Sequence, residues 1–152
     1  MTEATRVSSI EQVLEGFLRE VSIARHPATG RRVAASRVRL ACYLASDADA
    51  ALAPEERALV AAERQFGATG AAERALGPAA LLRALPGYLR RPWLPSEPIA
   101  ARTQVRMAEM LVDYVVGAEL VEAAEAATSA HAVSRAAAQA RRELAAATAP
   151  GG

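Results

Sequence analysis

Alanine is the sequence feature that most narrows the folds open to this chain. Thirty-nine of the 152 residues are alanine, so alanine supplies about half of the 52% of residues that are hydrophobic. Alanine has the highest helix propensity and is uncommon in strands, and its small side chain lets helices pack closely. No segment carries a clear strand pattern. We therefore predict an all-α fold, a single-domain bundle of about five to six helices.

The first helix is predicted by an apolar stripe with spacings of three and four residues. Its members are Ile10, Val13, Leu14, Phe17, Leu18 and Val21. Ser8 with Glu11, or Ser9 with Gln12, fits a capping box at the start of this helix. Gly16 lies inside it at a cost of about 1 kcal/mol relative to alanine, which suggests that a neighbouring element approaches closely there.

Prolines and short polar runs predict where the later helices begin and end. Residues 26–30 form a break, with Thr29 as the N-cap of a second helix that ends near residues 46–49. Prolines at 54, 78 and 98 favour three further helix starts, because the first helical position needs no amide proton. The helix from Pro54 has a short apolar face made of Leu59, Val60 and Phe66.

The segment between the helix from Pro78 and the helix from Pro98 also carries structural signals. Pro86, Pro92 and Pro95 forbid a long regular element, and Tyr88, Leu89 and Trp93 are expected to fix this loop onto the core. The helix that begins at Pro98 is the longest, and Gly117 ends or kinks it.

We divide the chain into a helical domain, residues 1–127, and an alanine-rich C-terminal helix with a fraying tail, residues 128–152. Val133 and Leu144 are almost the only large apolar residues of the second segment. Alanine gives this segment helix propensity but little surface to bury. We therefore expect a helix that packs on a partner, or that frays beyond Thr148.

The basic residues are unevenly distributed, although the formal net charge is only +1. All 18 are arginine. Residues 25–39 carry a net charge of +5 and residues 81–106 carry +4, whereas the segments around them are net negative. Each basic segment is a candidate strip of an anion-binding face. The alternative is that each basic segment is an ordinary solvated surface. The use of arginine without lysine is explained by a GC-rich genome.

The chain lacks the residue patterns of common catalytic and metal sites. Its single cysteine excludes a disulfide framework, and His26 and His131 have no second ligand at helical spacing. There is no glycine-rich phosphate loop and no lysine for a Schiff base. Cys42 lies among apolar residues and is expected to be buried. We expect no enzyme activity, no cofactor and no metal.

Targeting signals are also missing from the sequence. No apolar run approaches the length of a membrane span, and no signal-peptide pattern opens the chain. We therefore expect a cytoplasmic protein without membrane contact.

The two basic strips point to nucleic acid. Aromatic residues make up only 4% of the chain, too few to stack the bases of a single strand, which favours duplex DNA. A helix with Arg32 and Arg39 would contact phosphates, and Thr103 and Gln104 on the long helix are candidate readers of base edges. The predicted DNA-binding residues are Arg25, Thr29, Arg31, Arg32, Arg39, Arg102, Thr103 and Arg106.

Two local patterns accompany these strips. Residues 26–29 read His-Pro-Ala-Thr, and residues 111–123 combine a Val-Asp-Tyr-Val run with Glu-Leu-Val-Glu-Ala. Together with the helix order, they resemble the N-terminal core-binding domain of tyrosine recombinases, the phage integrases and their Xer relatives. That family has a Ser-Pro-x-Thr turn, and its long helix closes with an aromatic-tyrosine-leucine run followed by Leu-Ile-x-Ala. The likeness covers roughly residues 8–126.

The resemblance implies a C-shaped half-clamp that grips DNA with its second and fourth helices. It implies no recombination, because the catalytic residues of the family belong to a separate C-terminal domain. The protein would be a DNA-binding or decoy module, or a fragment of something longer. The sequence departs from the family at Val33, Arg37 and Ala124-Glu125, and residues 45–77 look like an insertion.

Two other functions fit the sequence. One is a helical protein–protein interaction module or homo-oligomer that packs through the alanine-rich C-terminal helix. The other is an enzyme or small-ligand protein with a site in the loop around residues 88–93. Charge placement distinguishes the leading hypotheses: convergence of the basic strips on one face favours DNA, whereas pairing with Glu55, Glu56 and Glu109 favours protein interaction.

Overall fold

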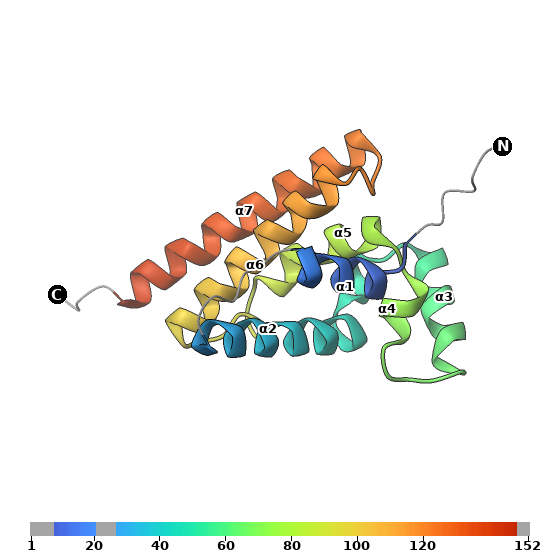
Figure 1. Ribbon diagram of the computed structural model, residues 1–152, viewed down its shortest axis with the longest axis horizontal. Coiled ribbons are helices and arrows are strands. Elements are labelled where there is room, and N and C mark those ends of the chain that lie inside the picture. The colour runs from blue at the N-terminus through green and yellow to red at the C-terminus, as the bar shows by residue number, and fades with distance from the viewer. Residues whose placement is uncertain (1–7, 21–26, 149–152) are drawn as a thin grey trace.

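The computed structural model describes residues 8–20 and 27–148, and every regular element within them is a helix (Figure 1). The prediction of an all-α fold is confirmed. The seven α-helices and one 3-10 helix of the described residues slightly exceed the expected number. In chain order they are α1 (Ile10–Glu20), α2 (Pro27–Ser46), η1 (Ala48–Ala51), α3 (Pro54–Arg64), α4 (Ala71–Ala75), α5 (Pro78–Tyr88), α6 (Pro98–Gly117) and α7 (Ala123–Thr148).

The three longest helices lie along the length of the molecule. α6 and α7 form an antiparallel pair, and α2 also packs against α6 (Figure 1). The first turns of α2 and α6 and the last turns of α7 therefore meet at one end of the molecule. α3 and α4 lie at the opposite end.

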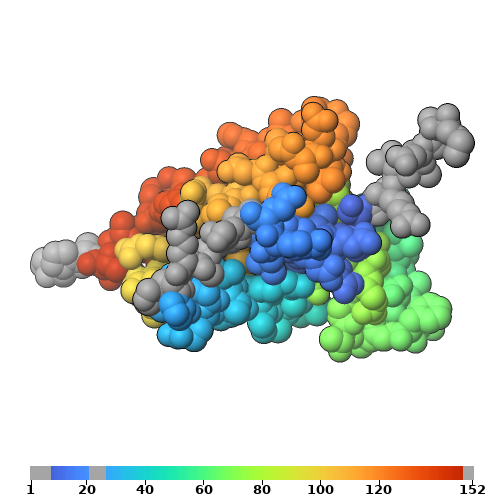
Figure 2. All heavy atoms as spheres, in the orientation of Figure 1, coloured from blue at the N-terminus to red at the C-terminus, as the bar shows by residue number. Residues whose placement is uncertain are grey.

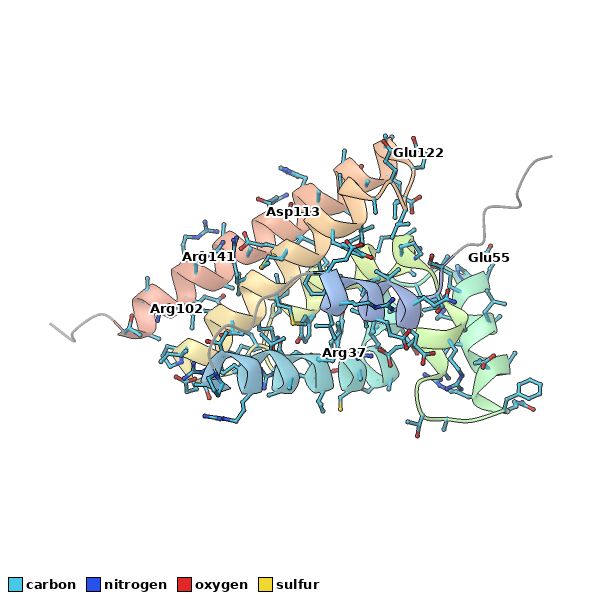
Figure 3. The ribbon with its side chains drawn as sticks, viewed as in Figure 1. Arg37, Glu55, Arg102, Asp113, Glu122 and Arg141 are labelled. Atoms are coloured by element: carbon cyan, nitrogen blue, oxygen red, sulfur yellow. The ribbon has the colours of Figure 1, made fainter. Side chains whose placement is uncertain are left out.

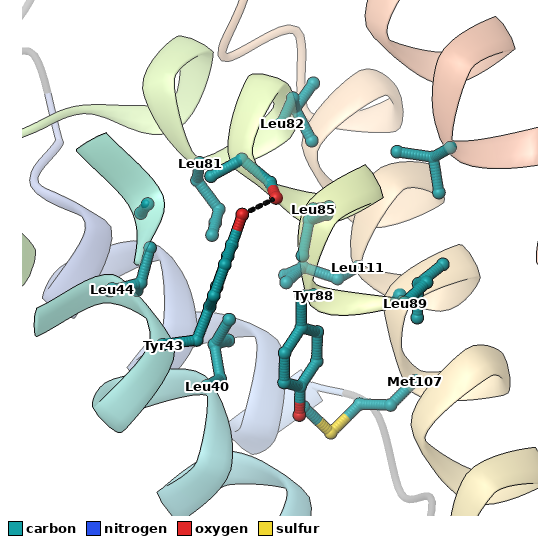
Figure 4. Packing of buried hydrophobic residues seen from close by; sticks show 14 of the residues in the cluster. Leu40, Tyr43, Leu44, Leu81, Leu82, Leu85, Tyr88, Leu89, Met107 and Leu111 are labelled. Atoms are coloured by element: carbon teal, nitrogen blue, oxygen red, sulfur yellow. Dashed lines mark hydrogen bonds between the residues drawn. The ribbon is translucent and has the colours of Figure 1, made fainter. Parts of the chain in front are cut away.

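The core is centred on α5, whose leucines and Tyr88 are fully buried between α2, α6 and α7 (Figure 4). The Tyr43 hydroxyl donates a hydrogen bond of 2.7 Å to the carbonyl of Ala84, which ties α2 to α5. Gly87 makes room for this ring, because a methyl group there would overlap the Tyr43 hydroxyl. The aromatic rings of Tyr43 and Tyr88 lie 5.8 Å apart.

Alanine forms a large part of this core, as its abundance suggested. Among the described residues, the buried alanines come from most elements of the bundle. Their small side chains let the helix backbones approach closely without leaving voids. They are Ala48, Ala71, Ala72, Ala80, Ala84, Ala101, Ala108, Ala126, Ala136, Ala137 and Ala140.

The first helix begins as predicted. The Ser9 amide donates to Gln12 Oε1 at 3.0 Å and the Gln12 amide donates to Ser9 Oγ at 3.2 Å, so the second of the two candidate capping boxes forms. Gly16 does face a close neighbour, because a methyl group there would overlap the Tyr114 hydroxyl of α6. Leu18 is exposed, contrary to the predicted stripe, and Val21 lies outside the described residues.

The start of the second helix differs from the prediction. α2 begins at Pro27, so Thr29 lies in its first turn rather than at the N-cap, and Gly30 does not interrupt it. Proline is well suited to the first helical position because its fixed φ matches the helix. The predicted end is confirmed, since α2 stops at Ser46 and η1 follows.

Three apolar residues expected inside lie at the surface. Phe66 is 89% exposed and Leu59 is 55% exposed, because α3 packs mainly against α4 and buries only Val60. Cys42 is also exposed. It lies on the outward side of α2, one turn after Val38, which is 62% exposed.

The C-terminal helix begins at Ala123, five residues before the predicted boundary, and runs to Thr148. One face of it is buried, including Val133, Ala137 and Leu144, and this face contacts α5 and α6. The C-terminal helix therefore packs against other helices of the same chain.

The connection from α5 to α6 is fixed onto the core, as predicted. Its start was predicted wrongly, because α5 continues through Pro86 to Tyr88, two residues that were expected in the loop. Leu89 and Leu94 are buried beyond the end of α5. Trp93 is half-buried, and its Nε1 donates a hydrogen bond of 2.6 Å to Asp47 Oδ2.

Candidate nucleic-acid interface

Parts of the two predicted basic strips meet at one end of the molecule. Arg31 and Arg32 lie in the first turns of α2, and Arg102 and Arg106 lie in the first turns of α6. We call these four residues the basic end. In Figure 2 the start of α6 (yellow) lies between the end of α7 (red) and the start of α2 (light blue).

Electrostatics at Glu97 show how close the two strips are. Hydrogen bonds from the backbone amides of Ile99 and Ala100 hold the pKa of Glu97 below its usual value. The charges of Arg32 and Arg102 lower that pKa further. One carboxylate is thus in electrostatic range of both strips, although it also caps the N-terminus of α6.

The guanidinium groups of the basic end remain available to a ligand. Arg31, Arg102 and Arg106 are exposed and Arg32 is half-buried. Within residues 8–20 and 27–148, none of the four makes an ion pair or a side-chain hydrogen bond. The hydrogen-bond donors of these four guanidinium groups are therefore not used within the described part of the fold.

A fifth arginine, Arg141 of α7, lies beside the basic end (Figure 3). Arg102 and Arg141 line a shallow pocket of about 380 Å³ with Leu144, Ala145 and Thr148. Arg141 also pairs with Glu109 of α6, and its Nη1 donates a hydrogen bond of 3.0 Å to Glu109 Oε2. This pairing lowers the pKa of Glu109 and raises that of Arg141.

Arg39 is directed into the protein rather than toward the basic end. Its Nε donates a hydrogen bond of 2.8 Å to Gln104 Oε1, and its Nη2 atom is buried. Burial raises the pKa of nearby Tyr88 to about 12, against the opposing charge of Arg39. The Tyr88 hydroxyl in turn donates to the Ser36 carbonyl at 2.5 Å. Arg39 thus belongs to a buried polar network between α2, α5 and α6.

Gln104 is the centre of that network, so the prediction that it reads base edges is wrong. Its side chain is 0% exposed. Besides accepting from Arg39, its Nε2 donates to the carbonyls of Tyr88 at 2.9 Å and Trp93 at 3.1 Å. A side chain with these three bonds cannot reach a groove of DNA.

The remaining predicted residues contribute less to the surface. Thr103 is half-buried and its Oγ1 donates to the Ile99 carbonyl at 3.0 Å, within its own helix. Thr29 is half-buried in the first turn of α2. Arg25 lies outside the described residues.

Several other arginines are neutralised by carboxylates. Arg37 of α2 pairs with Glu73 at 2.8 Å, and Arg83 of α5 pairs with Glu56 at 2.6 Å. Arg83 belongs to the basic segment of residues 81–106, and its partner Glu56 is one of the glutamates whose pairing with arginine would favour protein interaction over DNA binding. These ion pairs connect helices within the bundle and leave the basic end unaffected.

Metal-binding clusters and membrane-spanning helices are both missing from the residues that the structure describes. Within residues 8–20 and 27–148, no three His, Cys, Asp or Glu side chains are grouped so that they could hold a metal ion. The same residues contain no helix with the length and apolar character that a membrane crossing requires.

Comparison of the chain with protein-family models, with curated proteins and with solved structures produced no match. The resemblance to recombinase core-binding domains therefore stays a prediction.

Proposed function

We propose that this protein binds double-stranded DNA through the basic end. The observation that carries the proposal is that the starts of α2 and α6 lie at one end of the molecule, which brings together Arg32 and Arg102 from positions 70 residues apart in sequence (Figure 1). Four arginines that have no ion pair within the described residues gather at two adjacent helix starts. Phosphates of a duplex are the ligands that such a surface attracts most strongly.

Helix polarity adds to the charge of the arginines. The positive ends of the backbone dipoles of α2 and α6 both lie at the basic end. An anionic backbone lying across that end would therefore meet positive charge from side chains and main chain together. Glu97 accepts hydrogen bonds from two of the free amides of α6, those of Ile99 and Ala100.

Duplex DNA is favoured over a single strand because aromatic side chains do not line this surface. The tyrosines of α2 and α6 face the core, where Tyr43 contacts Tyr88 and Tyr114 contacts Phe17. Single-strand binding normally uses exposed aromatic rings on which bases stack.

The proposed contacts are to phosphates and carry little sequence information. Gln104 is buried, and the Thr103 hydroxyl is bonded within its helix, so neither is free to read bases. We therefore expect binding with weak discrimination between duplex sequences.

The alternative of an oligomer built on the alanine-rich helix has less support. The buried face of α7 is already covered by α5 and α6 of the same chain. The feature that motivated this alternative is thus explained without a second protein.

A salt series with a labelled duplex of about 30 bp tests the proposal, because the slope of log affinity against log salt is about −0.9 for each phosphate neutralised. The double variant Arg32→Ala/Arg102→Ala should weaken binding and reduce the magnitude of that slope by about 2. Changing the duplex sequence should have little effect.

The matched control is Arg57→Ala/Arg64→Ala on α3, at the opposite end of the molecule. It removes the same charge, and each side chain makes only one hydrogen bond, to a backbone carbonyl. Equal losses of DNA affinity in the two double variants would refute a localised basic end, and so would no binding by the unmodified protein at about 50 mM salt.

A further inference from the structure

We propose that a second site, a groove between α7 and the α5–α6 connection, binds a ligand that carries several linked phosphates. The groove has a volume of about 760 Å³. None of its lining residues belongs to the basic end or to the pocket beside Arg102 and Arg141. The proposal is therefore independent of DNA binding.

The floor of the groove and one of its walls come from α7, and the other wall comes from the α5–α6 connection. Ala132, Ala136 and Ala140 follow one another at intervals of four residues, so they form a continuous low ridge along the helix. Leu89 from the end of α5 adjoins it. Ala136 and Ala140 are buried against the neighbouring helices, so this ridge closes the bottom of the groove.

Arginines stand on both sides of this floor. Arg90 and Arg91 come from the α5–α6 connection, and Arg135 and Arg142 come from α7. Glu143 is the acidic residue of the lining, and it accepts a hydrogen bond of 3.0 Å from Gln139. The lining therefore has a clear excess of positive charge.

Three of these arginines have unused hydrogen-bonding capacity. In the described part of the chain, Arg90, Arg91 and Arg135 make no ion pair and no side-chain hydrogen bond. Arg142 Nη2 donates to Gln139 Oε1 at 2.7 Å, an uncharged partner. Like charges gathered around one concave surface repel each other, and an anion bound between them removes that repulsion.

The groove is held in shape before any ligand arrives. Trp93, two residues after Arg91, is bonded to Asp47, and its carbonyl accepts from the buried Gln104. Leu89 and Leu94 are both buried and fix the two sides of the connection. A rigid wall lowers the entropy cost of binding.

The lining selects for phosphate groups rather than for an organic body. Its volume is that of a small-molecule site, about 300–1,000 Å³. Leu89 is its one large apolar residue, and the lining contains no aromatic ring on which a base could stack. Guanidinium groups bind phosphate oxygens in pairs, and a single anion would satisfy only part of this arginine set. Linked phosphates along the groove would engage both walls.

Calorimetric titration with tripolyphosphate, ATP and orthophosphate tests this site. We expect tripolyphosphate to bind, and orthophosphate to bind much more weakly. The double variant Arg91→Ala/Arg135→Ala removes one arginine from each wall and should raise the Kd for tripolyphosphate about ten-fold or more. Arg57→Ala/Arg64→Ala is again the charge-matched control and should leave that Kd unchanged.

The source of the phosphates is read from the comparison with ATP. Equal affinity for ATP and tripolyphosphate identifies a free phosphate chain as a sufficient ligand, and tighter binding of ATP identifies a nucleotide. Either result supports the site. Binding of ATP without tripolyphosphate would overturn it, because the groove would then recognise the nucleoside.

DNA binding separates this proposal from the preceding one. The groove variant should bind the labelled duplex as the unmodified protein does, even if the basic end fails its own test. Three results would overturn the groove: no titration signal with tripolyphosphate at about 1 mM, an unchanged Kd in the groove variant, or a parallel loss of duplex affinity. A thermal unfolding curve confirms that the variant is folded.

Discussion

Single side chains determine how closely α1 and α6 approach each other. Gly16 of α1 faces Tyr114 of α6, whose ring also makes an edge contact with Phe17 at 5.8 Å between centroids. The absence of a side chain at Gly16 leaves space for the Tyr114 hydroxyl. Alanine would be favoured at this position by helix propensity alone, so packing rather than propensity explains the glycine.

Gly16→Ala should therefore lower the free energy of unfolding by about 1–3 kcal/mol, because overpacking outweighs the gain of about 1 kcal/mol in helix propensity. Urea denaturation followed by circular dichroism measures the change. Tyr114→Phe removes the overlapping hydroxyl, and the double variant should recover most of the loss. A stabilised Gly16→Ala protein would contradict the packing argument.

At the scale of elements, small residues bring α7 close to α5 and α6. Ala137 and Ala140 are each 1% exposed, and Val133 and Leu144 are buried one turn or more on either side of them. A helix with so few large apolar residues gains stability only when its backbone lies near its neighbours. The close approach is thus a requirement of the sequence.

Ala137→Leu should destabilise the protein by about 2 kcal/mol or more, because the added atoms have no space between α7 and its neighbours. Ala127→Leu on the exposed side of α7 is the control and should change the unfolding free energy by less than about 0.5 kcal/mol. The midpoints of urea unfolding give both values. Equal effects at the two positions would show that α7 does not pack as described.

The pair of Glu109 and Arg141 makes the contact of α6 with α7 depend on pH. Arg141 holds the pKa of Glu109 below its usual value of 4.5. A carboxylate with a lowered pKa in the folded state contributes stability above its unfolded pKa, and this contribution is lost as pH falls through the folded pKa.

The difference in stability between the unmodified protein and Glu109→Gln should therefore be largest near about pH 7 and shrink as the pH falls through the lowered pKa of Glu109. Unfolding midpoints across that range measure it. Glu119→Gln, an exposed residue beyond the end of α6, serves as the control. A difference that stays constant with pH would exclude this ion pair as its cause.

At the scale of the whole molecule, a formal net charge of +1 conceals a strong separation of charge. The basic end and the arginine groove both present unpaired guanidinium groups. Arginines elsewhere in the bundle, such as Arg37, Arg74 and Arg83, are paired with glutamates. Average charge therefore describes this molecule poorly, and local fields govern what it attracts.

Local signals were enough to place most helices. Pro54, Pro78 and Pro98 each begin a helix at the predicted residue, because the preference of proline for the first turn needs no tertiary context. The position of α7 was harder to predict. Alanine occupies half of the positions of α7 and lies on all of its faces, so the sequence does not show which alanines are buried.

The site was less predictable, since it depends on where long side chains point. Arg31 and Arg39 lie on the same helix, yet Arg31 faces solvent and Arg39 is bonded to Gln104. That difference arises from packing of α2 against α6. Arg135 and Arg142 were missed because they lie in a segment with a net charge of −3, where counting by segment hides them.

The exposure of Cys42 has a practical consequence. It is the one cysteine of the chain, as Trp93 is the one tryptophan. A thiol-reactive dye on Cys42 would sit on the outer side of α2, the helix that begins with Arg31 and Arg32, so energy transfer from a labelled duplex can be followed without mutagenesis. Trp93 lies in the connection that supplies Arg90 and Arg91, and its intrinsic emission reports on the contact of that connection with Tyr43 and Asp47 of the neighbouring segment. The unmodified chain thus carries one optical reporter on the helix of the basic end and another on the connection between α5 and α6.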